Sequence, residues 1–421
     1  MERIYFDNAS TTFPKPQEVP DAMYRFMTQV GSNINRGCYE QAYRTEEIVY
    51  ETRELLRSMF GGNDCKNVVF TRNVTESLNV LLKGFLKPGD HVIVSSMEHN
   101  AVMRPLQQLT GCGVTFSRVP CHADGTLNAA DLEDFLTDRT RAVVMMHASN
   151  VCGTLLPIEE TGAFCRRHGL KFFLDSAQTA GVWPIDMERM HIDALAFTGH
   201  KGLLGPQGIG GFLLRDEMIP LIQPLISGGT GSISHTEEIP EFMPDRFEAG
   251  TLNLPGIIGL HAGLQWLNRT GIDAVREHEL ALTKRFLEGL AVIEPGILDV
   301  AGGKSVPEIL DASNGKTVPE ILDASNGKTV PGRLRLAGRP DCTMRTGVVS
   351  IQTTAMDPAE AAFELDDRYG IMTRVGLHCA PSAHKTLGTF PTGTIRFSFG
   401  WWNTAAEVDH ALKALETIIG K

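Results

Sequence analysis

The chain has 421 residues, of which 42% are hydrophobic and 21% charged, and its formal net charge is −11 at pH 7. This length exceeds one ordinary core, so we expect a large and a smaller domain, with the composition of a soluble globular protein. The negative charge argues against a nucleic-acid or anionic-membrane partner, and no apolar run approaches the roughly 20 residues that span a membrane.

The N-terminal stretch and the cysteines favour a cytoplasmic location. The stretch MERIYFDNAS is charged and lacks the apolar run of a signal peptide. The cysteines show no Cys-x-x-Cys spacing, which is typical of free thiols in a reducing compartment. They are Cys38, Cys65, Cys112, Cys121, Cys152, Cys165, Cys342 and Cys379.

From about residue 45 to 215, short apolar runs alternate with amphipathic helical patterns. A helix is predicted from a cap at Thr45 to Gly61 and Gly62. Because the apolar runs carry no polar face, we expect a mostly parallel sheet covered by helices on both faces. The predicted strands are 67–71, 91–96, 141–147, 171–175 and 193–199.

After about residue 260 the pattern changes to that of a smaller α+β unit. We predict a large domain at 14–260 and a small domain formed by 1–13 and 261–421. The sequence VPEILDASNGKT occurs twice in tandem, at 306–317 and 318–329. Its GKT resembles a phosphate-binding loop but lacks the earlier glycine. We therefore predict an exposed loop of the small domain without chemistry.

Polar residues follow several predicted strands, at the sheet edge where ligands of α/β proteins bind. Asn73 and Glu76 are spaced as a capping box, so Val74 and Thr75 would offer free N–H groups to a phosphate. His99 and Asn150 follow later strands. Each of these residues, taken alone, is more often structural than functional.

Two further strand ends carry sharper chemistry. Asp175 ends an apolar strand, where an unpaired carboxylate is costly and a buried cation would compensate it; Gln178 follows. Lys201 comes after Thr198 and His200 at another strand end and precedes a glycine-rich loop, a setting suited to a Schiff base. A phosphate cradle, a ring neighbour, an acid and an amine together indicate pyridoxal phosphate.

Cys379 lies in RVGLHCAPSAHKTLGT, and three interpretations are open for it. It is a reactive thiol, a metal ligand with His378 and His384, or a small core residue. The metal interpretation is the weakest, because no further ligands occur at a recognisable spacing. We therefore predict no metal site.

Eight motifs occur in order along the chain: IYFDNASTT, FTRNVTESLN, SMEHNAVMRP, HASNVCGTLLPI, FFLDSAQTAG, FTGHKGLLGPQGIGG, FEAGTLN and RVGLHCAP. In these motifs the chain resembles the class V aminotransferase family of fold-type I pyridoxal-phosphate enzymes, in its cysteine desulfurase and selenocysteine lyase branch. The resemblance covers essentially the whole chain outside the repeat, and the short RVGLHCAP form is similar to the second group of desulfurases.

The resemblance implies a role for each site residue. Lys201 would form the Schiff base, Asp175 would contact the pyridine nitrogen, Gln178 the ring hydroxyl, and His99 would stack on the ring. Cys379 would accept sulfur as a persulfide. The phosphate would be held by Val74, Thr75, Thr198, His200 and, from the neighbouring subunit of a homodimer, Thr251; the substrate would be bound by Arg396, Asn150 and Arg374.

The implied reaction converts L-cysteine to L-alanine and passes the sulfur to Cys379. Alternatives are a selenocysteine lyase acting on L-selenocysteine without a cysteine nucleophile, another class V aminotransferase or lyase, and a non-catalytic sulfur carrier. A sulfur-acceptor protein would be a further partner.

Overall fold

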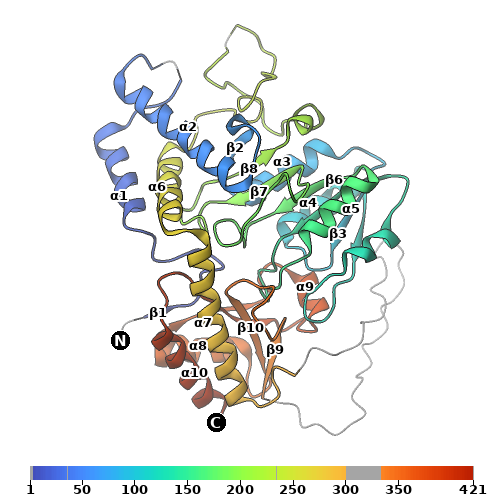
Figure 1. Ribbon diagram of the computed structural model, residues 1–421, viewed down its shortest axis with the longest axis vertical. Helices are drawn as coiled ribbons and strands as arrows, with labels where there is room; N and C mark the ends of the chain where they lie inside the picture. Colours follow the sequence, from blue (N-terminus) through green and yellow to red (C-terminus); the bar gives the residue numbers. More distant parts are fainter. Residues whose placement is uncertain (1–2, 36, 234, 300–332, 421) are drawn as a thin grey trace.

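The computed structural model describes residues 3–35, 37–233, 235–299 and 333–420 (Figure 1). The repeat at 306–329 therefore lies outside the described residues. A seven-stranded sheet has the order β2-β8-β7-β6-β5-β3-β4. All neighbouring pairs are parallel except those of β8, so the predicted α/β class with a mostly parallel sheet is confirmed. The strands are β2 (Val68–Thr71), β3 (His91–Ser95), β4 (Thr115–Val119), β5 (Thr140–Met146), β6 (Lys171–Asp175), β7 (Ala194–Thr198) and β8 (Gly210–Leu214).

Each face of this sheet has its own core, because successive side chains of a strand point to opposite faces. In β6, Phe172 and Leu174 pack into one core and Phe173 into the other. The first core includes side chains of α2 (Glu40–Phe60), α5 (Ile158–His168) and α6 (Leu254–Thr270). The second includes those of α3 (Val74–Phe85) and α4 (Asn100–Thr110). Both faces are thus covered by helices.

Two features of this region differ from the sequence-based expectation. Helix α2 begins at Glu40, not at a cap at Thr45, whose buried hydroxyl donates to the Gln41 carbonyl at 2.8 Å within the helix. The glycine-rich segment after Lys201 contributes the strand β8 between β2 and β7. A Cβ atom at Gly211 would lie 2.4 Å from the Val69 carbonyl oxygen, so glycine there permits the close approach of the strands.

A second sheet of four antiparallel strands has the order β12-β13-β10-β9. Near it, β1 (Ile4–Tyr5) pairs with β11 (Ile371–Met372), so the N-terminal segment joins elements from the far end of the chain. The strands are β9 (Leu334–Ala337), β10 (Val348–Thr353), β12 (Arg374–Gly376) and β13 (Thr394–Ser398). Helices α7 (Ile272–Ile293), α8 (Pro358–Tyr369) and α10 (Ala405–Ile419) share its core.

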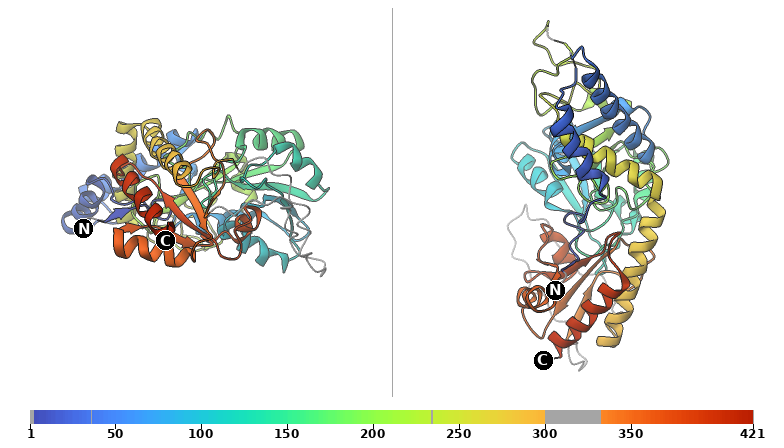
Figure 2. Two further views of the ribbon diagram at one scale, coloured as in Figure 1. Left: turned by 90° about the horizontal axis from the view of Figure 1, so that it is seen from below. Right: turned by 90° about the vertical axis from the view of Figure 1, so that its left-hand side faces the viewer.

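The two sheets are bridged by α6 and α7, which follow one another along one side of the molecule (Figure 2). The boundary predicted at residue 260 falls inside α6, which packs on α2 and on α1 (Glu18–Arg25). The remaining helix, α9 (Pro381–Thr386), follows Cys379. Among the described residues, none of these helices is long and apolar enough to cross a membrane.

Candidate active site

The predicted site residues lie at one edge of the large sheet. Strand β2 runs antiparallel to β8, and β8 antiparallel to β7, so the carboxyl end of β2 meets those of the parallel strands. His99 follows β3 and Asn150 follows β5. Asp175 is the last residue of β6, and Lys201 follows β7. This edge is where ligands bind in open α/β sheets.

The start of α3 and the end of β7 carry unused hydrogen-bonding groups. The Asn73 side chain accepts from the Glu76 N–H at 3.0 Å, but Glu76 bonds to the Arg72 N–H, so the predicted reciprocal box is half formed. The Thr198 hydroxyl and His200 Nδ1 are buried and have no hydrogen-bond partner among the described residues. With the N-terminal turn of α3 they form a donor set that fits a phosphate.

Burial shifts the ionisation of both Asp175 and Lys201. Burial raises the pKa of Asp175, whose Oδ1 accepts from the Ala177 N–H at 2.9 Å. Burial lowers the pKa of Lys201 to about 8, and the nearby Asp175 carboxylate opposes this shift. No ion pair to Asp175 occurs in the part of the chain that the structure describes. A protonated ring nitrogen would supply the missing cation, so these residues fit pyridoxal phosphate.

His99 forms the N-cap of α4. Its Nδ1 accepts from the Ala101 N–H at 3.0 Å, so in the neutral ring Nε2 carries the proton. Burial, with a contribution from Lys201, lowers the pKa of His99 to about 4, which keeps the ring neutral. Gln178 donates from Nε2 to the Ala9 carbonyl at 3.1 Å. The contacts of His99 and Gln178 with the cofactor ring stay predictions.

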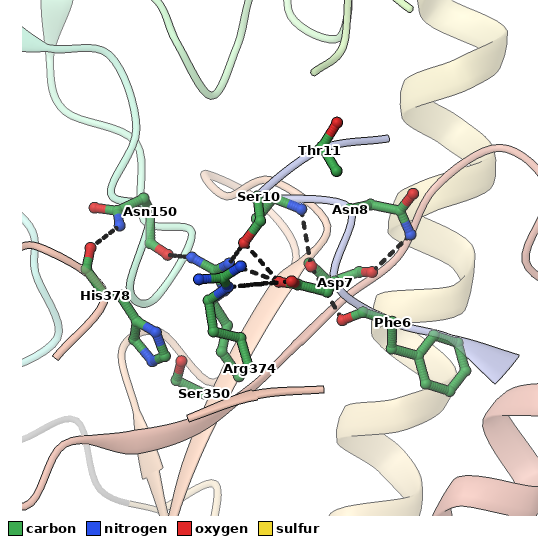
Figure 3. A network of polar contacts seen from close by, with 12 residues as sticks. Phe6, Asp7, Asn8, Ser10, Thr11, Asn150, Ser350, Arg374 and His378 are labelled. Carbon is green, nitrogen blue, oxygen red and sulfur yellow. Dashed lines mark hydrogen bonds and ion pairs between the residues drawn. The ribbon is translucent and has the colours of Figure 1, made fainter. Parts of the chain in front are cut away.

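Cys379 lies in a loop that is bonded to the large-sheet edge. The Asn100 N–H donates to the Cys379 carbonyl at 2.9 Å, and Asn150 Nδ2 to the His378 carbonyl at 2.7 Å (Figure 3). Cys379 itself is exposed, so the interpretation as a core residue is wrong. The His378 ring bonds to Thr394 and the His384 ring to Thr389.

Arg396 projects from β13 and is 2% exposed. Its Nη1 donates to the Asn150 carbonyl at 2.9 Å, which joins the predicted substrate-binding residues in one network. Its Nη2 donates to Asp7 Oδ1 at 2.9 Å, and Arg374 Nε donates to Asp7 Oδ2 at 3.1 Å. Thr251 lies exposed in the loop before α6, and its predicted contact with a neighbouring subunit stays a prediction.

Asp7 is the charged residue of this network that sequence reasoning missed. The strand register indicates that an acidic residue is needed there, because Arg374 and Arg396 are direct partners across β12 and β13. Like charges directly opposite each other are destabilising unless an opposite charge joins them. Predicting the role of Asp7 therefore requires knowing which strands pair, and the IYFDNASTT motif alone gives no information about that pairing.

Known proteins resemble this chain over nearly its whole length. The chain is 30% identical to a probable cysteine desulfurase of Methanothermobacter thermautotrophicus, covering 100% of this chain and 95% of the relative. A probable cysteine desulfurase of Pyrococcus abyssi has the same identity and coverage. The apo structure of the cysteine desulfurase from Thermococcus onnurineus superposes with a TM-score of 0.85 at 30% identity, covering 99% of this chain and 95% of that one.

A second solved structure, the cysteine desulfurase CsdA of Escherichia coli, gives a TM-score of 0.80 at 27% identity, covering 99% of this chain and 95% of that one. The family model described as "Aminotransferase class-V" matches residues 4–300 and 330–411. The chain therefore belongs to the class V aminotransferase family.

Proposed function

We propose that this protein is a pyridoxal-phosphate-dependent cysteine desulfurase, which converts L-cysteine to L-alanine and leaves the sulfur on Cys379 as a persulfide. The observation that carries the proposal is the position of Cys379: it is exposed, yet its own carbonyl is bonded to Asn100, next to His99. The loop that carries this thiol is therefore bonded to the sheet edge at which Lys201 and Asp175 lie. Full-length relatives named as cysteine desulfurases support the same activity.

Bound pyridoxal phosphate supplies an aldehyde for the substrate amine and a ring that accepts electrons from the substrate carbon. In this chain Thr198, His200 and the first turn of α3 would hold its phosphate, and Asp175 its ring nitrogen. Thr251 of a neighbouring subunit would complete the phosphate site.

The chain's own residues would bind the substrate and move its proton and sulfur. Arg396 and Arg374 bind the carboxylate. Lys201, whose pKa burial lowers to about 8, takes the α-proton. The Cys379 thiolate attacks the substrate sulfur, and the new S–S bond replaces the Cβ–S bond of the substrate. Cβ takes the proton that the Cys379 thiol gave up, and Lys201 returns the α-proton to Cα, which gives alanine.

The direct test is incubation of the purified, cofactor-loaded protein with L-cysteine and a dithiol reductant, followed by assay of sulfide and alanine. We expect equimolar products from the wild type and none from Lys201→Ala. Cys379→Ala removes the sulfur acceptor and should lose nearly all turnover of L-cysteine. Matched activity of Cys379→Ala on L-selenocysteine would favour the selenocysteine lyase alternative, and wild type without products would contradict the proposal.

A homodimer and a sulfur-accepting protein belong to the same proposal. Aromatic side chains of the N-terminal helices are exposed: Tyr24 is 64% exposed and Tyr43 59%. Apolar surface of this kind favours burial against a second copy. Size-exclusion chromatography with light scattering tests the dimer.

A further inference from the structure

The N-terminal segment after β1 brings one carboxylate to two arginines of the small sheet (Figure 3). We propose that Asp7 is a positioning residue that holds Arg374 beside Arg396, so that both guanidinium groups receive the substrate carboxylate. This inference rests on the proposed function, because it assigns part of the substrate site to a residue that does not itself touch the substrate.

The strand register places Arg374 and Arg396 directly opposite each other on neighbouring strands. Two guanidinium groups at such a pair repel each other. Burial is the main cause that lowers the pKa of Arg396, and the repulsion from Arg374 lowers it further. The Asp7 carboxylate accepts hydrogen bonds from both arginines. Arg396 Nη2 donates to its Oδ1 at 2.9 Å, and Arg374 Nε donates to the same oxygen at 3.2 Å. The carboxylate thus offsets the repulsion that would separate them.

The two arginines depend on Asp7 to different degrees. Arg396 is almost fully buried and also donates to the Asn150 carbonyl and to Ser10 Oγ at 2.6 Å. The Arg374 side chain is 50% exposed, and its hydrogen bonds within the described ranges go to Asp7 alone. Loss of the Asp7 charge should therefore release Arg374 to solvent while Arg396 stays in place.

The remaining charge and donors suit one carboxylate. Two guanidinium groups and one carboxylate leave a single positive charge. Arg396 Nε is buried and has no hydrogen-bond partner in the described structure, and the terminal nitrogens of Arg374 are not used by Asp7. Both arginines therefore keep guanidinium donors that no residue of the described structure uses, and such donors suit an α-carboxylate.

A double-mutant cycle tests the assignment, with Asp7→Asn, Arg374→Gln and the double variant, all loaded with cofactor. Calorimetry measures binding of L-alanine, which carries the carboxylate, and of L-alaninamide, which does not. We expect each single variant to weaken L-alanine binding about tenfold and to leave alaninamide nearly unchanged. The double variant should bind L-alanine no more weakly than either single variant, because Asp7 acts through Arg374.

The matched control is Asp409→Asn, which removes the carboxylate of an exposed pair with Arg285 and should change no affinity. Unchanged or tighter L-alanine binding by Asp7→Asn would overturn the inference, as would additive effects in the double variant. If Asp7→Asn does not fold, Arg374→Gln still tests the proposal, because Arg374 is half-exposed and its replacement should not prevent folding. Undiminished L-alanine binding by Arg374→Gln would also contradict the proposal. Wild type that binds L-alanine but releases no sulfide from L-cysteine would contradict the proposed function alone.

Discussion

At the scale of single residues, Lys201 lies where burial controls the ionisation of its amine. Its pKa falls to about 8, so the neutral form that reacts with an aldehyde predominates above that pH. We predict that the rate at which the apoprotein takes up pyridoxal phosphate rises with pH and levels off above about 9, with its inflection near the pKa of Lys201. Stopped-flow absorbance across pH 6 to 10.5 measures this profile.

Two variants test whether the inflection in that experiment reports the ionisation of Lys201. Lys15 also has a pKa lowered by burial, to about 7, so Lys15→Met must leave the inflection in place. Asp175 raises the pKa of Lys201, so Asp175→Asn should move the inflection to lower pH. A rate that keeps rising to pH 10.5, as for an exposed lysine, would contradict the assignment.

The residues that the sequence could predict are those whose position follows from one strand. Asp175 and Lys201 come at or just after the ends of apolar runs, so their place at the sheet edge follows from local pattern. Asp7 is different, because its partners lie 367 and 389 residues away along the chain. Which charges meet across such a separation depends on tertiary packing, which local pattern does not contain.

At the scale of elements, α5 packs closely because it contains a glycine. A Cβ atom at Gly162 would lie 1.8 Å from the Met190 carbonyl oxygen, so α5 would have to move away from the segment before β7. Gly162→Ala should lower the free energy of unfolding by about 2 kcal/mol, because overpacking exceeds the gain in helix propensity. Urea denaturation measures the change.

Gly111, just after α4, provides the matched control. It is exposed with φ −63°, and a Cβ atom there would come no closer than 3.4 Å to the Gln108 carbonyl oxygen. Gly111→Ala should therefore stay within about 0.5 kcal/mol of the wild type. Equal stability of the Gly162 and Gly111 variants would show that α5 adjusts without cost.

Element prediction succeeded where burial on both faces makes a strand continuously apolar. Strand β6 has the predicted bounds, and β5 and β7 differ from prediction by one residue at each end. Strand β8 opens with two glycines and β4 starts exposed, so neither has that signal. The start of α2 was misplaced because Thr45 resembles a cap, although its hydroxyl bonds within the helix.

At the scale of the whole molecule, the N-terminal segment connects both parts of the candidate site. Asn8 Nδ2 donates to the Ser398 carbonyl of β13 at 3.0 Å, while Thr12 donates to the Lys201 carbonyl at 2.9 Å. The segment thus links the sheet that carries Arg396 to the loop that carries Lys201. The arrangement explains how residues from the two ends of the chain contribute to one candidate site.

The tandem repeat lies outside the part of the chain that matches the family, because the match stops at residue 300 and resumes at 330. The repeat therefore belongs to no part of the chain that the family shares, and α7 and β9 flank it. We predict that deleting one copy, residues 318–329, leaves cofactor uptake and sulfide release within twofold of the wild type. Shortening the sequence between residues 299 and 333 by one copy changes the free energy of closing that connection by only about 0.4 kcal/mol. A deletion variant that folds but loses activity would show that the repeat contributes to the site.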